Sequence, residues 1–315
     1  MGVAVFERLR TREALRRYGL VLSFLLLCLA LTLLSDRFLT ASNLLNVLRQ
    51  ATINGIIAVG MTYVILTAGI DLSVGSVLAL ATVVAADLMQ TGLPVPLGVL
   101  AGLGVGTLLG AINGLLIART GIPPFVVTLG MMTVARGLAL TYTQGRPITG
   151  LPASFTFLGA GFLGPIPMPI VLFALVFGVG YFVLARTVFG EWVYALGDNP
   201  VAARLTGLPT RRVTALVYVI SGFLAALAGL ILVARLNSAQ PTAGQGFEFD
   251  AIAAVVVGGT SFAGGEGGLF GTLLGVLIIQ VLNNGLNLLN VSPLWEGVVK
   301  GVVIALALLL HRAAR

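Results

Sequence analysis

Asp71 carries a negative charge where the surrounding sequence is apolar. It lies in a short break, Gly69–Gly75, between two long apolar runs. On insertion scales a carboxylate near the bilayer centre costs about 2.5–3.5 kcal/mol, so it needs a chain break, an interface or an aqueous cavity beside it. Asp71 and Ser73 together could cap the following helix. Alternatively, Asp71 could line or gate a polar pathway.

Arg136 is the second unexpected charge, deep within the apolar stretch Gly130–Thr143. An isolated guanidinium in lipid is unfavourable, and the side chain does not easily reach an interface from this position. We therefore expect a partner for Arg136, which could be a structural contact or part of a pathway.

Amide side chains recur inside several apolar runs. Asn283 and Asn287 are four residues apart and share one face of a helix. Amides bind sugar hydroxyls without the strong desolvation of a charge, which suits a pathway for neutral polyols. They also hold membrane helices together, at about 0.6 kcal/mol per hydrogen bond. The candidate pathway residues are Asp71, Asn54, Asn113, Arg136, Asn283, Asn284 and Asn287.

The composition of the chain requires a lipid environment for these residues. Hydrophobic residues make up 58% of the 315 positions and charged residues 9%, and mean hydropathy is +1.06. Soluble domains are about one quarter charged. The 18 basic and 11 acidic residues are too few to keep a globule of this size in water. We expect an all-α, polytopic transmembrane helix bundle.

Ten apolar segments are long enough to be considered as spans, at about 20 residues each. The eighth is short and runs into Gly-rich sequence, which predicts a half-span or a re-entrant segment. The first follows a basic stretch that imitates a signal peptide, but Ser35–Phe38 offers no small-x-small cleavage site, so we expect it to remain. The segments are 19–34, 53–70, 73–91, 95–118, 123–143, 168–185, 213–235, 251–263, 268–289 and 295–311.

The basic residues predict the orientation in the membrane. An even number of spans places both ends of the chain on one side, together with Arg119 and the loop 186–212. Twelve of the 18 basic residues then lie on that side, and positive charge marks the cytoplasmic face. We expect a cytoplasmic segment 1–18, a membrane domain 19–311 and a cytoplasmic end 312–315. This distribution of charge also argues against a nucleic-acid ligand.

The loop 186–212 is the longest hydrophilic stretch between spans. Pro200 is suited to open a short helix with Asn199 as its N-cap, and Gly207 to close it. A capped helix carrying Arg204 in the cytoplasm could dock another protein, or the segment could be an ordinary loop.

Sequence signals for catalysis are absent. No G-x-x-x-x-G-K-[ST] motif is present, so the chain has no P-loop for ATP hydrolysis. The lone histidine is His311 and the lone cysteine is Cys28, and no metal-binding spacing occurs. The sequence therefore predicts a protein that is not an enzyme and binds no metal.

Three blocks of sequence stand out: Ala58–Thr62 with Gly69–Ser76; Tyr194–Asn199 with Ala203 and Gly207; and Ala239–Gly244 with Asp250–Ser261 and Leu282–Asn287. Together they resemble the ribose-type permeases of bacterial ABC sugar importers. The resemblance extends from about residue 20 to 310.

This resemblance implies a ten-helix permease in the inner membrane, with two related halves of opposite orientation. It also implies three protein partners: a second copy of the chain, a cytoplasmic ATPase subunit that binds ATP and Mg, and a periplasmic sugar-binding protein. The permease itself would bind no cofactor, and ribose is the first expectation for the monosaccharide. Val201 stands where the family usually has an acidic residue. The residues implied to couple to the ATPase are Asn199, Pro200, Ala202, Ala203, Arg204 and Gly207.

Two other classes of transporter remain as alternatives. In a proton-coupled secondary transporter, Asp71 or Glu266 would carry the coupling proton. A passive channel would need no energy source. Neither alternative requires a docking loop.

Overall fold

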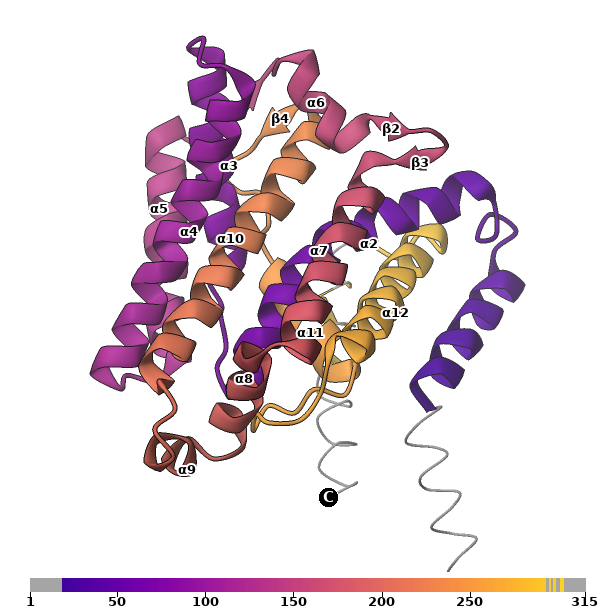
Figure 1. The fold of residues 1–315 in the computed structure, drawn as a ribbon. Helices are drawn as coiled ribbons and strands as arrows, with labels where there is room; N and C mark the ends of the chain where they lie inside the picture. Colours follow the sequence, from indigo (N-terminus) through magenta and orange to yellow (C-terminus); the bar gives the residue numbers. More distant parts are fainter. Residues whose placement is uncertain (1–18, 293–294, 296, 299–300, 303–315) are drawn as a thin grey trace, which may run out of the picture.

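The protein is a bundle of helices in the computed structural model, which describes residues 19–292, 295, 297–298 and 301–302 (Figure 1). Within these residues, six helices are long and apolar enough to cross a membrane. Two shorter apolar helices, Gly19–Leu34 and α3 (Val74–Gln90), accompany them. The six are α2 (Ala41–Leu66), α4 (Val95–Thr120), α5 (Pro124–Thr143), α7 (Met168–Arg186), α10 (Thr210–Leu236) and α12 (Leu269–Leu288). Most of the predicted segment 295–311 lies outside the described residues.

The start of α2 differs from the sequence prediction. We expected the second segment at 53–70, but the helix begins at Ala41 and ends at Leu66. The first turns of α2, before residue 53, contain Asn43, Asn46 and Gln50, whose polar side chains are typical of a loop. Their side chains hydrogen-bond to residues on α10 and α12, so the helix continues through them.

Small residues allow α4 and α10 to pack closely against each other. A Cβ added to Gly106 or Gly110 would collide with the backbone of Gly222 or Tyr218 on α10. Close backbone approach is how membrane helices gain packing energy. Of the glycines on α4, Gly104 has open space around it and does not take part.

Two crossings of the bundle are broken into a non-helical part and a helix. Residues 67–73 precede α3, and residues 240–246 precede α11 (Phe247–Val257). With 11 residues α11 is about 16 Å long and cannot cross a bilayer alone. The eighth segment is therefore short, as expected, but its helix begins four residues before the predicted range 251–263 and ends six residues before that range ends. The break before α11 meets the first turn of α3, since a Cβ on Gly75 would collide with the Gly244 carbonyl.

The connections between long helices lie at opposite ends of the bundle (Figure 1). One end carries α6 (Ala153–Ala160) and two small antiparallel pairs. These pairs are β1 (Ile148–Thr149) with β4 (Ser238–Ala239) and β2 (Phe162–Leu163) with β3 (Ile166–Pro167). The other end carries α8 (Val188–Asp198) and α9 (Pro200–Leu205), and we call it the α9 end.

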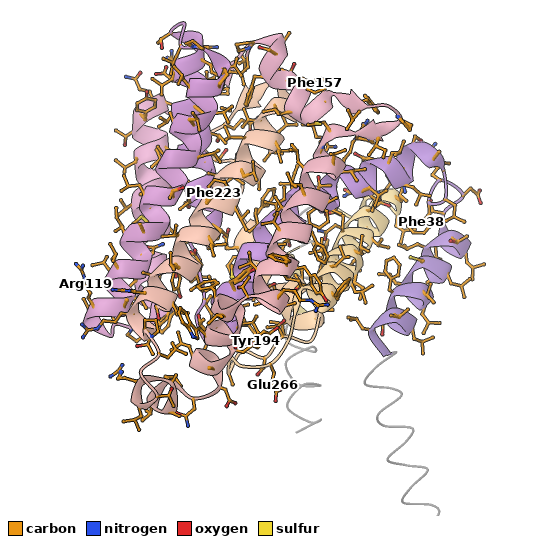
Figure 2. All side chains as sticks on the ribbon, viewed as in Figure 1. Phe38, Arg119, Phe157, Tyr194, Phe223 and Glu266 are labelled. Atoms are coloured by element: carbon orange, nitrogen blue, oxygen red, sulfur yellow. The ribbon has the colours of Figure 1, made fainter. Side chains whose placement is uncertain are left out.

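Arg119, Tyr194 and Glu266 all lie at the α9 end, whereas Phe38 and Phe157 lie toward the opposite one (Figure 2). Arg119 closes α4, and Tyr194 belongs to the segment 186–212. The expectation that Arg119 and this segment share one side is therefore confirmed for these described residues. The side of the membrane that they face stays a prediction.

Candidate functional site

Two rows of amides face each other across α2 and α12. Asn43 and Asn284 donate to each other's amide oxygens over 3.0 and 2.8 Å. Gln280 Nε2 donates to Gln50 Oε1 over 2.7 Å, and Asn54 Nδ2 donates to Gln280 Oε1 over 3.5 Å. Helix spacing produces both rows, because residues three or four apart share a face.

These rows border a cavity of about 320 Å³ between α2, α10, α11 and α12. This volume lies near the lower end of the range for small-molecule sites, which is about 300–1,000 Å³. Its wall is lined by Gln50, Ile53, Asn54, Leu232, Arg235, Leu236, Phe247, Asp250, Gln280 and Asn283.

Among the described residues, Asn283 has a buried, unpaired acceptor at this wall. The side chain is 8% exposed, and its Oδ1 accepts no hydrogen bond from the described residues. A buried acceptor left unsatisfied costs about 1–3 kcal/mol, so a hydroxyl donor entering the cavity would be favourable here. Amide and charged groups beside apolar walls are the donor and acceptor set that a polyol needs.

The cavity gathers only part of the predicted set. Asn54 and Asn283 line it, whereas Asn284 is occupied by Asn43. Asn287 donates to the Asn283 carbonyl on its own helix, over 3.0 Å. Asn284 and Asn287 are not among the residues that line the cavity wall.

Asp71 forms a separate buried cluster where α3 begins. Its Oδ1 accepts from the Ser73 amide over 2.9 Å and from the Ser73 hydroxyl over 2.6 Å. Its Oδ2 accepts from the Ser221 hydroxyl on α10 over 2.8 Å. Asn113 Nδ2 donates to Ser73 Oγ over 3.0 Å. The carboxylate is 1% exposed and links the residues before α3 to α10, whereas the N-cap of α3, Ser73, makes no side-chain capping hydrogen bond.

Arg136 has the partner that its position demands. Its Nη1 donates to the carbonyls of Pro241 and Ala243, over 2.6 and 2.9 Å. Glu248, in the first turn of α11, adds an electrostatic attraction. The guanidinium thus replaces the helical hydrogen bonds that the carbonyls of the break before α11 lack. This geometry agrees with the structural alternative of the sequence prediction.

The capped helix predicted at 199–207 is present as α9. Asn199 Oδ1 accepts from the amides of Val201 and Ala202, over 3.1 and 2.9 Å. Pro200 is its first residue, and Gly207 follows it with φ of +83°. Ala203 is buried.

Two large apolar side chains on α9 point away from the protein. Val201 is 70% exposed and Leu205 is 82% exposed. They stand four residues apart and therefore lie on one face. The outward face of α9 is thus apolar at a polar end of the bundle.

Helix α8 connects α9 to the Gly-rich loop between α11 and α12. The Tyr194 hydroxyl donates to the Gly267 carbonyl over 2.9 Å. Burial raises the pKa of the Tyr194 phenol, so the hydroxyl keeps its proton. The Gly265 amide donates to the Leu66 carbonyl at the end of α2 over 3.0 Å, and a Cβ on Gly197 would collide with both groups.

Several residues of the cavity were not among the sequence candidates: Gln50, Arg235, Asp250 and Gln280. A signal for Gln50 was available, since Asn43, Asn46, Gln50 and Asn54 recur every three or four residues. Nothing in the local sequence marks Asp250 or Arg235 as cavity residues. Among the described residues, no group of three His, Cys, Asp or Glu side chains could hold a metal ion.

Known proteins share this sequence pattern over nearly the whole chain. Residues 43–308 match the family described as "Branched-chain amino acid transport system / permease component". The ribose import permease protein RbsC of Bacillus subtilis is 48% identical, with 97% of this chain and 96% of the relative covered. RbsC of Escherichia coli is 46% identical over 96% of each, and the D-allose permease AlsC of E. coli is 40% identical over 88% and 85%. No solved structure matches.

Proposed function

The chain belongs to the permease-component family of branched-chain amino acid transport systems, and from this premise we propose that it is the membrane subunit of an ATP-driven monosaccharide importer, with ribose as its substrate. The observation that carries the proposal is the 46–48% identity to ribose import permeases over 96–97% of the chain. The chain is a permease without a catalytic site of its own. The inner membrane of a bacterium is its proposed location.

The amide-lined cavity is the proposed substrate pathway. The amide rows of α2 and α12 offer neutral donors and acceptors to sugar hydroxyls, with Asn283 Oδ1 as a buried acceptor that has no partner among the described residues. A permease that receives sugar from a periplasmic binding protein does not need tight binding of its own. Asp71, Asn113 and Arg136 hold helices and breaks in place beside this pathway.

Docking of a cytoplasmic ATPase, which binds ATP and Mg itself, is proposed at α9. The exposed Val201 and Leu205 would enter an apolar groove of that subunit. Movement of α9 would then pass through α8 and Tyr194 to the Gly-rich loop 258–268. That loop joins α11 and α12, and both helices line the cavity.

Two inverted halves are supported by the pairing of elements. In each half a long helix precedes a break and a shorter helix: α2 before α3, and α10 before α11. The long helices run in opposite directions between the two ends (Figure 1). Contacts repeat as well, since α4 packs on α3 and α10 while α12 packs on α11 and α2. Paired breaks of this kind accompany substrate sites in transporters with inverted repeats.

The α9 end is proposed to face the cytoplasm. With the ten spans proposed from the sequence, both termini would lie on this same side. A second copy of the chain would form the other half of the transporter. The exposed apolar side chains of α4, α5 and α7 supply faces for lipid or for such a copy.

A proton-coupled transporter is not favoured by any observation. Asp71 accepts hydrogen bonds at both oxygens, and the exposed Glu266 lies at the α9 end (Figure 2). Neither residue is among those that line the amide cavity.

Complementation tests the substrate. In bacteria that lack their own ribose permease, expression of this chain with its ATPase and binding protein should restore uptake of labelled ribose. Restored uptake of D-allose without uptake of ribose would refute ribose as the substrate.

A further inference from the structure

A second cavity lies at the α9 end, apart from the amide-lined one. Its volume is about 230 Å³. The end of α4, the starts of α5 and α10, and the helices α8 and α9 form its wall, at the lower left of Figure 1. This space is separate from the amide-lined pathway, although Pro200 and Arg204 of the proposed docking helix α9 belong to its wall.

The wall of this cavity is positively charged. Arg204 and Arg211 are among its lining residues, together with the hydroxyl-bearing Thr210 and Thr214. Among its described lining residues there is no carboxylate. Arg119 and Arg212 add positive charge nearby in the chain, at the end of α4 and the start of α10. The site is therefore suited to an anion with several oxygen acceptors.

A buried donor in the same wall lacks an acceptor. Tyr218 is 1% exposed, and its hydroxyl makes no hydrogen bond with the described residues. The hydroxyl lies against Gly69, which also lines the cavity, and any Cβ at Gly69 would collide with it. Asp71 interacts electrostatically with this phenol but is held by Ser73 and Ser221 outside the wall. A ligand oxygen in the cavity would satisfy the hydroxyl.

Apolar surface adjoins the cavity on the outside of α4 and α5. Leu116, Ile122 and Phe125 are 45%, 42% and 52% exposed, within a few residues of the lining residues Ile117, Gly121 and Pro124. An anionic ligand with long apolar chains would contact both the charged cavity and this surface. Basic pockets between membrane helices on the cytoplasmic side bind anionic lipid headgroups.

We propose that this cavity binds the phosphate headgroup of an anionic phospholipid, with Arg204 and Arg211 on the phosphate and Tyr218 as a donor to a headgroup oxygen. The acyl chains lie along α4 and α5. Because α9 contributes Arg204, the lipid ties the short helix to the ends of α4 and α10.

Native mass spectrometry of the full chain in detergent tests the site. Phosphatidylglycerol and phosphatidylcholine with identical acyl chains are titrated separately, and the dissociation constant of the first bound lipid is measured. Phosphatidylglycerol should bind more tightly. Arg211→Gln should weaken it about tenfold, the loss expected for one charge-assisted hydrogen bond. Tyr218→Phe should weaken it several-fold.

Arg212→Gln is the matched control. It removes the same charge from the residue next to Arg211, and Arg212 does not line the cavity. It should change the dissociation constant less than about twofold. Equal loss in both arginine variants, or equal binding of the two lipids, overturns the proposal. Inorganic phosphate that displaces phosphatidylglycerol at equal concentration would overturn the lipid as occupant.

Discussion

Replacement of Leu205 by alanine should weaken assembly with the ATPase without disturbing the permease itself. Leu205 is 82% exposed on α9, so its side chain contributes little to the fold. Alanine also favours a helix at least as well as leucine. Burying a leucine side chain contributes about 1.5–3 kcal/mol relative to leaving it exposed. Since most of this surface is free, docking in a groove should lose about 2 kcal/mol, or about 30-fold in Kd.

Binding of the ATPase subunit to the permease in lipid nanodiscs measures this effect. The Kd is compared for the wild type, Leu205→Ala and Leu163→Ala. Leu163 is a suitable control, because it is 61% exposed in β2 at the opposite end of the bundle. Val201→Ala should weaken binding in the same direction as Leu205→Ala, since both side chains share one face. An unchanged Kd for Leu205→Ala, or an equal loss in Leu163→Ala, would refute docking through the apolar face of α9.

Three further substitutions examine the pathway, the coupling route and the buried carboxylate. Gln280→Leu removes hydrogen bonds to Gln50 and Asn54 and should slow uptake about tenfold. Asn287→Leu, on the same helix but off the cavity wall, should have little effect on the uptake rate, and equal slowing would contradict the assigned pathway. Gly197→Ala places a methyl group against the Leu66 carbonyl and should destabilise the protein by about 1–3 kcal/mol in thermal unfolding. Gly104→Ala, which enters open space, should not destabilise it, and similar melting curves for the two variants would count against tight packing at α8. In Asp71→Asn the amide oxygen can still accept from Ser73, and the amide nitrogen can donate to the Ser221 hydroxyl. ATP-driven uptake should therefore persist. Abolished uptake in a stably folded variant would favour a proton relay.

Local signals in the sequence were sufficient for α9. Asn199, Pro200 and Gly207 act on their own neighbours, through an N-cap, a first-turn proline and a residue with positive φ. Such interactions span a few positions, so the sequence contains all the information needed. The apolar face formed by Val201 and Leu205 was missed, because exposure depends on what the rest of the fold leaves uncovered.

Residues with distant partners could not be placed in the same way. Asn43 meets Asn284 across 241 positions of sequence, and Asp71 meets Ser221 across 150. The start of α2 was therefore predicted too late, since its polar first turns are stabilised only by tertiary contacts. Arg136 binds two backbone carbonyls, which every residue possesses and no sequence pattern marks.

Uptake of labelled ribose into vesicles tests energisation by ATP most directly. The permease is reconstituted with its ATPase, and the sugar-binding protein and ATP are supplied on their respective sides. Accumulation should require ATP and all three proteins, and a proton gradient alone should drive none. Accumulation by this chain alone under a proton gradient would contradict the proposed function.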